Sequence, residues 1–131
     1  MSRYDKYDPY DGGFRARLNA ALTSSDIGKI RAVSINTSGR VVIGDGGGGL
    51  IAVRGLICPT EAMPAGAAID VMTDGEITDA TETAGTAFTG GALVYAHIDG
   101  SVDDTAASGK AMGFTIEVDR VIVRAETTKA A

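Results

Sequence analysis

The sequence predicts an all-β fold: a compact sandwich-like or barrel-like body of short hairpins, preceded by an extended N-terminal arm and one short helix. A segment typical of a β-hairpin, residues 66–79, returns at a constant offset as residues 91–104. Eighteen glycines and no tryptophan in 131 residues are typical of short strands joined by many turns. Between residues 112 and 125, apolar and polar residues alternate, as they do in strands with one buried face.

The two copies of the repeated segment share an Asp-Gly pair at their centre. Asp74-Gly75 and Asp99-Gly100 suit the positive-φ positions of a tight hairpin turn, and strand-like residues flank both pairs. Two copies are too few for a solenoid, so we expect two successive hairpins within one sheet system. Further strands are expected at residues 29–36, 40–43 and 50–57, the first two joined by a turn at residues 37–39.

The closing hairpin is expected to bury one face. The residues that alternate toward one side of its strands are Met112, Phe114, Ile116, Val118, Val121, Val123 and Ala125.

Composition divides the chain into an N-terminal arm, residues 1–25, and a β-rich domain, residues 26–131. With 44% hydrophobic residues, one domain of this length can build a core. Apolar runs are only a few residues long, too short to span a membrane, and no secretory signal is visible. We therefore expect synthesis in the cytoplasm and no membrane partner.

The arm is unusually rich in aromatic residues. Tyr-Asp recurs at positions 4, 7 and 10, and this three-residue period matches the extended polyproline II geometry. Tyrosine provides a large contact area at low entropic cost, which favours an arm that docks on a partner or a neighbouring subunit. Two alternatives stay open: an arm folded over its own body, and a free tail.

A short helix is predicted to follow, over residues 14–22, because Phe14, Leu18 and Leu22 are spaced four residues apart. Such a helix is marginal alone and needs a surface to pack against. The residues expected to bind a partner are Tyr4, Tyr7, Tyr10, Phe14, Arg15, Arg17, Leu18 and Leu22.

Alternation also sorts the strands of the repeated segment into two faces. One face, expected in the core, carries Ile69, Val71, Val94, Ala96 and Ile98. The other face carries a mixture too apolar for ordinary surface, and we expect it to form a subunit interface. The residues of this expected interface are Met72, Leu93, Tyr95 and His97.

The net charge of −5 is unevenly distributed, because residues 55–109 contain no Lys or Arg and many carboxylates. Lys and Arg bind phosphate backbones, so this half of the chain argues against nucleic-acid binding. The cations lie in the arm and in two outer blocks, 29–54 and 110–129. Such segregation permits contacts between basic and acidic surfaces of two copies, or with a larger partner.

No catalytic group is predicted. Cys58 is the sole cysteine, so it forms no internal disulfide, and we expect a half-buried structural thiol at a strand end. His97 is the sole histidine and no nucleophile motif accompanies it. The glycine-rich loop 44–49 has the letters GxGxxG but precedes a strand-like run instead of a helix, so a hairpin loop is expected.

No cofactor or metal is predicted either. One histidine and one cysteine cannot form a tetrahedral zinc site without several carboxylates. Residues 70–75 begin like a calcium loop, but Met72 occupies a ligand position and the closing Glu82 is out of register. Turn residues are the better interpretation of this segment.

Residues 65–77, 91–95, 99–102, 113–117 and 120–124 carry a resemblance to a known family. In their order and hairpin pattern they resemble the small β-rich head-decoration, or capsid cement, proteins of tailed bacteriophages. The Tyr-Asp arm departs from the short plain N-termini of that family.

The resemblance implies a compact, β-tulip-like body that clamps the outside of an expanded capsid, often as a homotrimer. Its partners would be the major capsid protein and further copies of itself, and its place would be the exterior of the virion. The role would be mechanical, not enzymatic, because many modest contacts together oppose the internal pressure of packaged DNA. Two alternatives stay open: another head or tail component, and a β-rich carbohydrate-binding or protein-binding module.

Overall fold

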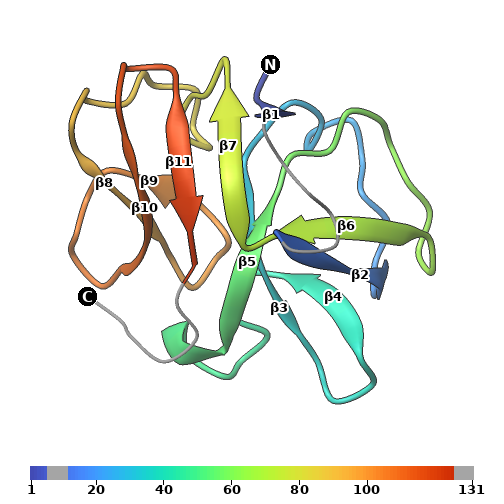
Figure 1. The fold of residues 1–131 in the computed structure, drawn as a ribbon. Helices are drawn as coiled ribbons and strands as arrows, with labels where there is room; N and C mark the ends of the chain where they lie inside the picture. Colours follow the sequence, from blue (N-terminus) through green and yellow to red (C-terminus); the bar gives the residue numbers. More distant parts are fainter. Residues whose placement is uncertain (6–11, 126–131) are drawn as a thin grey trace.

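The computed structural model describes residues 1–5 and 12–125, and it confirms the predicted all-β fold (Figure 1). The elements in chain order are β1 (Arg3–Asp5), β2 (Gly13–Leu18), β3 (Arg31–Ile35), β4 (Arg40–Ile43), the 3-10 turn η1 (Leu50–Ala52), β5 (Val53–Ile57), β6 (Ala68–Met72), β7 (Asp74–Thr78), β8 (Leu93–Ala96), β9 (Val102–Asp103), β10 (Lys110–Thr115) and β11 (Val121–Arg124). Among these described residues, no helix is of a length and apolarity that could cross a bilayer.

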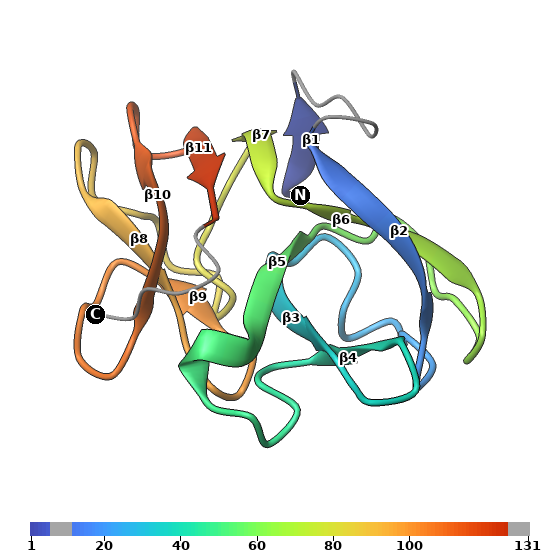
Figure 2. The same ribbon diagram turned by 60° about the horizontal axis from the view of Figure 1, so that its bottom comes forward.

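The strands form two units that share an interface. One is a six-stranded sheet in the order β1-β7-β11-β10-β8-β9, and the other is a closed barrel in the order β2-β4-β3-β5-β6. Figure 2 shows the sheet beside the barrel, with β5 and β7 near the middle. All ladder pairs are antiparallel except β2 with β4, which are parallel.

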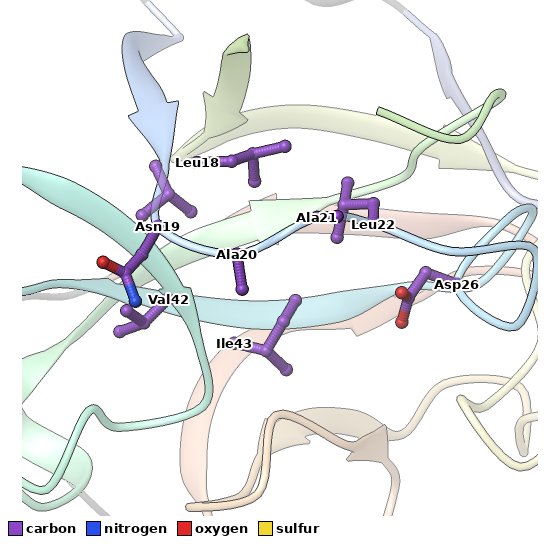
Figure 3. Close-up of a pocket in the computed structure, with 9 residues that line it drawn as sticks. Leu18, Asn19, Ala20, Ala21, Leu22, Asp26, Val42 and Ile43 are labelled. Atoms are coloured by element: carbon purple, nitrogen blue, oxygen red, sulfur yellow. The ribbon is translucent and has the colours of Figure 1, made fainter. Parts of the chain in front are cut away.

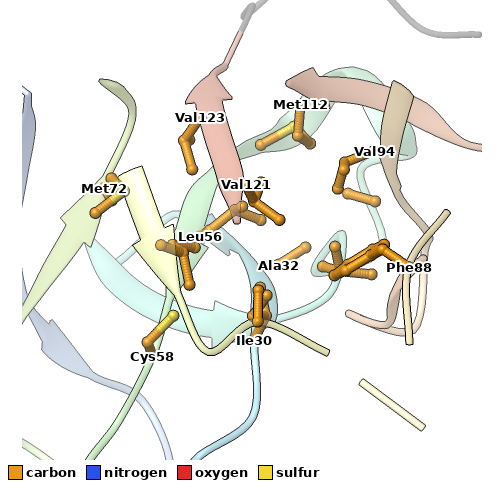
Figure 4. Close-up of a cluster of buried hydrophobic side chains, with 14 of the residues drawn as sticks. Ile30, Ala32, Leu56, Cys58, Met72, Phe88, Val94, Met112, Val121 and Val123 are labelled. Atoms are coloured by element: carbon orange, nitrogen blue, oxygen red, sulfur yellow. The ribbon is translucent and has the colours of Figure 1, made fainter. Parts of the chain in front are cut away.

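Two hydrophobic cores result, one inside the barrel and one between the barrel and the sheet. The barrel core consists of Leu18, Leu22, Val33, Val41, Ile57, Ile69 and Val71. The shared core draws Leu56 and Met72 from the barrel strands and Val94, Met112 and Val123 from the sheet (Figure 4). The ends of β5 and β6 therefore supply side chains to both cores: Leu56 and Met72 to the shared core, and Ile57 and Val71 to the barrel core.

Three of the predicted hairpins are confirmed. Strands β3 and β4 pair across the expected turn, where the Asn36 side-chain oxygen accepts hydrogen bonds from the Ser38 and Arg40 backbone N–H groups, both at 3.0 Å. Strands β8 and β9 pair across Asp99-Gly100, with Gly100 at φ +87° as a tight turn requires. Strands β10 and β11 form the closing hairpin.

The hairpin predicted for residues 66–79 is wrong. Strands β6 and β7 do not pair with each other: β6 pairs with β2 and β5 in the barrel, and β7 pairs with β1 and β11 in the sheet. The Gly12 carbonyl accepts hydrogen bonds from the backbone N–H groups of Thr73, at 2.7 Å, and Asp74, at 3.0 Å. The chain therefore turns a corner from barrel to sheet here, and Asp74-Gly75 begins a strand.

The helix predicted for residues 14–22 is also wrong, because its first half is strand β2. Phe14, Ala16 and Leu18 pack on the barrel core, and Arg15 and Arg17 are exposed on the other face. A spacing of four residues is compatible with a period of two as well as with a helical period. Residues 13–17 pair with five residues of β6, and this pairing makes the segment a strand instead of a helix.

The described part of the expected arm belongs to the body. Strand β1 is the edge strand of the six-stranded sheet, paired with β7, and β2 is a barrel strand. The boundary expected after residue 25 is therefore not a boundary of this fold. Of the expected docking tyrosines, Tyr7 and Tyr10 lie outside the described residues.

The alternation predicted for the closing hairpin breaks at a bulge. The register of β10 against β8 shifts between Ala111 and Gly113. Met112 is buried in the shared core, whereas Phe114, Ile116 and Val118 are exposed, contrary to the prediction. The side chain of Phe114 lies on the outer face of the sheet because the bulge shifts the phase of β10, and Ile116 and Val118 lie beyond the end of this strand, in the turn to β11.

Candidate interaction surface

A row of apolar side chains crosses the outer face of three sheet strands. Leu93 on β8 lies opposite Phe114 on β10, and Phe114 lies opposite Ile122 on β11. Leu93 is 52% exposed and Phe114 is 42% exposed. We call Leu93, Phe114 and Ile122 the apolar row. Exposed apolar side chains gathered in one place are typical of interaction sites.

The turn between β10 and β11 adds more apolar surface to the same end of the sheet. Ile116 and Val118 lie in this turn, and both are exposed. The turn is held by the hydrogen bond from Ile116 N to Arg120 O, at 3.1 Å. Arg120 also pairs with the buried carboxylate of Glu76, with Nε 2.9 Å from Oε1. An ion pair thus anchors the turn that presents these two side chains.

Gly113 creates the bulge that exposes Phe114. A Cβ atom at this position would collide with the carbonyl oxygen of Ile122, so the close approach of β10 and β11 requires glycine. Beyond the bulge, Thr115 points inward, where its hydroxyl donates to Thr89 O at 2.6 Å and accepts from Ala92 N at 3.0 Å. Simple alternation predicts apolar side chains at the inward positions of this strand, whereas beyond the bulge the inward position is occupied by the buried polar side chain of Thr115.

The structure divides the subunit interface expected from the sequence. Leu93, Tyr95 and His97 follow one another along and just beyond β8, with Leu93 exposed and the other two half-buried. The imidazole Nε2 of His97 lies 2.7 Å from Asp103 Oδ1 on β9. Met72 is fully buried in the shared core on β6. Its assignment to an interface is therefore wrong, since no neighbouring molecule could reach it.

Several residues expected to bind a partner serve the fold itself. The Tyr4 hydroxyl donates to Asp70 O at 2.9 Å and accepts from Cys58 N at 3.2 Å. Leu18 and Leu22 are buried in the barrel core. For Leu18 and Leu22 the expected docking role is wrong, because their side chains are enclosed.

The two expected arginines are exposed on the barrel. Arg15 forms a two-point ion pair with Asp70, with nitrogen–oxygen distances of 2.8 and 3.3 Å. Arg17 lies directly opposite Arg40 across the parallel β2–β4 pair, and its Nη1 donates to Gly66 O at 2.9 Å. Arg15 is thus neutralised within the chain, whereas Arg17 faces a second cation.

An apolar cavity of about 190 Å³ opens where the chain leaves β2 and diverges from β4 (Figure 3). Its lining consists of Leu18, Asn19, Ala20, Ala21, Leu22, Asp26, Val41, Val42 and Ile43. Asp26, its one charged lining residue, already pairs with Arg31 at 3.1 Å. The cavity suits an aliphatic group and offers no set of polar groups that would orient a substrate.

The titratable side chains of the described residues form no reactive constellation. Burial raises the pKa of the Cys58 thiol, which disfavours the nucleophilic thiolate. Within residues 1–5 and 12–125, no three His, Cys, Asp or Glu side chains are grouped to hold a metal ion. The segment considered as a calcium loop, residues 70–75, lies mostly in the extended strands β6 and β7.

One carboxyl pair lies beside β9. The backbone N–H of Asp104 donates to Glu82 Oε2 at 3.3 Å, and Asp104 Oδ2 accepts from Thr89 N at 2.8 Å. Desolvation raises the pKa of Glu82, and the Asp104 and Asp103 carboxylates raise it further. The hydrogen bond from Thr89 N lowers the pKa of Asp104. The pair therefore concentrates negative charge at this end of the sheet.

No protein-family model and no curated protein sequence matches this chain. Among solved structures, a chain from Mycobacterium phage Patience has a similar fold, with a TM-score of 0.83 and 19% sequence identity. The match covers 99% of this chain and 98% of that chain. The likeness therefore extends over both units, the barrel and the sheet, and at this identity it concerns the fold.

Proposed function

We propose that this protein is a structural virion protein of a tailed bacteriophage, a head-decoration protein that binds the outer surface of the expanded capsid. The observation that carries the proposal is the fold likeness to a chain of phage origin over 99% of this chain, at a TM-score of 0.83. The resemblance of residues 30–124 to decoration proteins supports the same role. The partners would be the major capsid protein and further copies of this protein, assembled as a homotrimer.

The proposed mechanism is mechanical. Burial of exposed apolar surface contributes roughly 25 cal/mol per Å², so the apolar row supplies a modest attachment per copy. Many copies on one shell add such contacts, and a lattice holds even where each contact is weak. In this mechanism the load would pass through the hydrogen-bonded strands of the sheet and barrel.

The proposal includes neither catalysis nor a cofactor. Its support is the state of the thiol, the side chain best suited to nucleophilic chemistry: Cys58 is buried and has a raised pKa. The acidic stretch 55–109 supports a protein partner over nucleic acid.

The test is co-sedimentation of the purified protein with expanded empty heads of its own phage, with bound copies counted per capsid subunit. Saturation near one copy per capsid subunit is the expected result. Binding of only a few copies per head would point instead to a vertex, portal or tail component. Absence of binding by folded protein would overturn the capsid role and leave a β-rich binding module.

A matched pair of variants locates the attachment. Phe114→Asp places a charge in the apolar row and should weaken head binding about ten-fold or more. Ile51→Asp makes the same kind of change at η1, where Ile51 is 54% exposed outside this face, and should leave binding unchanged. Equal effects of the two substitutions would exclude the apolar row as the attachment surface.

A further inference from the structure

Two arginines of the barrel stand side by side without a carboxylate. Arg17 and Arg40 are direct partners in the parallel β2–β4 ladder, an arrangement in which like charges repel. Arg17 Nη1 donates to Gly66 O at 2.9 Å, and a Cβ atom on Gly66 would lie 3.5 Å from Arg40 Nη1. The two guanidinium groups therefore converge on the same backbone segment.

Their contacts within the chain satisfy only part of their hydrogen-bonding capacity. Arg40 Nη1 donates to Leu18 O at 3.3 Å, so both side chains bond to backbone carbonyls, and neither forms an ion pair with a described carboxylate. Most other arginines are paired: Arg3 with Asp79, Arg15 with Asp70, Arg31 with Asp26, Arg120 with Glu76 and Arg124 with Asp74. A guanidinium presents five N–H donors, so most donors of this pair have no acceptor among the described residues.

The opposite charge accumulates beside the sheet. Glu82 and Asp104 lie next to each other near β9, and neither forms an ion pair with a described Lys or Arg. Thr83 N donates to Val102 O at 3.0 Å, which fixes the Glu82 segment against β9. In both ribbon views, β9 lies on the sheet side of the molecule and β2 on the outer side of the barrel (Figures 1 and 2).

We propose that the Arg17–Arg40 pair is a carboxylate-binding site for a second copy of this protein, occupied by the Glu82 and Asp104 side chains of that copy. Guanidinium groups bind carboxylates through short, charge-assisted and often two-point hydrogen bonds, so two arginines match two carboxylates. The unpaired charge at each of the two sites is thereby neutralised by a neighbouring copy.

The placement of the two sites determines the kind of assembly. Because one site lies on the barrel and the other beside a strand of the sheet, the contact joins two different surfaces head to tail, and such contacts form a ring if the rotation closes. The inference deepens the proposed function and rests on it, since a protein that coats a shell gains from contact between neighbouring copies. It concerns only the contact between copies and leaves the apolar row free to face the capsid.

The test measures self-association in the absence of capsids, by sedimentation velocity over a range of protein and salt concentrations. Wild-type protein should form oligomers that weaken as salt rises, since salt screens exposed charge pairs. The double variants Arg17→Glu/Arg40→Glu and Glu82→Arg/Asp104→Arg should each weaken association about ten-fold or more. The double variant Lys29→Glu/Arg54→Glu makes an equal charge change elsewhere in the barrel region and should associate like wild type.

Charge exchange provides the decisive comparison. The quadruple variant that combines both reversals restores opposite charges at the contact and should recover the wild-type oligomer mass. Circular dichroism confirms folding, and Arg17→Gln/Arg40→Gln replaces the reversal if that variant fails to fold. A monomeric wild type, an unaffected arginine variant, or a quadruple variant that stays monomeric would each overturn the contact. Head co-sedimentation of the same proteins reports separately on the proposed function.

Discussion

Gly44 and Gly100 touch where the β8–β9 turn of the sheet meets the end of the barrel. A Cβ atom on Gly100 would lie 2.9 Å from Gly44 N, closer than side-chain carbons come to backbone nitrogen. Two hydrogen bonds of Ala32 fix this contact: its carbonyl accepts from Gly44 N at 2.8 Å, and its N–H donates to Gly100 O at 2.9 Å. The two units are thus joined by backbone bonds as well as by their shared core.

This contact predicts the effect of a single methyl group. Gly100→Ala adds a Cβ atom against the barrel at a residue with φ +87°, and we expect it to lower the free energy of unfolding by about 2 to 4 kcal/mol. Gly39→Ala is the matched control, because Gly39 has φ +76° but no atom near the added carbon. Its cost should be only about 1 kcal/mol, from the backbone alone. Urea denaturation measures the free energy of unfolding of both variants. Equal losses would contradict the close contact between Gly100 and the barrel.

Strand β10 allows a test of the bulge. Met112→Ala opens a cavity in the shared core and should lower the free energy of unfolding by about 2 to 5 kcal/mol. Phe114→Ala removes a larger side chain from the outer face and should cost about 1 kcal/mol or less. Thermal unfolding at matched concentration compares the two. Similarly large losses from the two substitutions would mean that the strand continues its alternation through Gly113, with both side chains on the buried face.

The repeated segment shows how far local sequence could predict this fold. Asp99-Gly100 forms the predicted hairpin turn, whereas Asp74-Gly75 begins a strand in the other unit. The local chemistry of the two pairs is the same, so the difference comes from what each strand pairs with. β6 pairs with β2, more than fifty residues earlier in the chain, and single-sequence patterns carry no information on such distant partners.

The surface was harder to predict than the fold. The exposure of Leu93 was expected, but Phe114 was assigned to a buried face because it continues an alternating run. The signal that could have corrected this is Gly113 within that run, since an isolated glycine in a strand often marks a bulge. Arg17 was expected to bind a partner, yet its pairing with Arg40 depends on the parallel β2–β4 contact. The helical interpretation of residues 14–22 concealed that contact.

The β8–β9 turn should carry a measurable pH dependence. Asp99 Oδ1 accepts from the Ser101 hydroxyl at 2.6 Å and from Ser101 N at 2.9 Å, and these bonds lower the pKa of Asp99 below its ordinary value of 3.8. A carboxyl group whose pKa is lower in the folded protein stabilises the fold at pH values above its ordinary pKa. This stabilisation is lost as the pH falls through the lowered pKa. Asp99→Asn should therefore reduce the melting temperature at pH 7 but have little effect near about pH 2. A pH-independent difference between the proteins would contradict this origin.

Cys58 provides a probe of the shared core. Its thiol is buried just beyond β5, and burial raises its pKa, so the native protein should react slowly with a thiol reagent at pH 8. Reaction then requires opening of the core, and its rate should follow the stability of each variant. Gly100→Ala, which loosens the contact between barrel and sheet, should therefore speed labelling, whereas Gly39→Ala should do so much less. As a control, full labelling in urea shows that the thiol can react once the protein is unfolded. Rapid labelling of the native wild-type protein would contradict the enclosed position of Cys58.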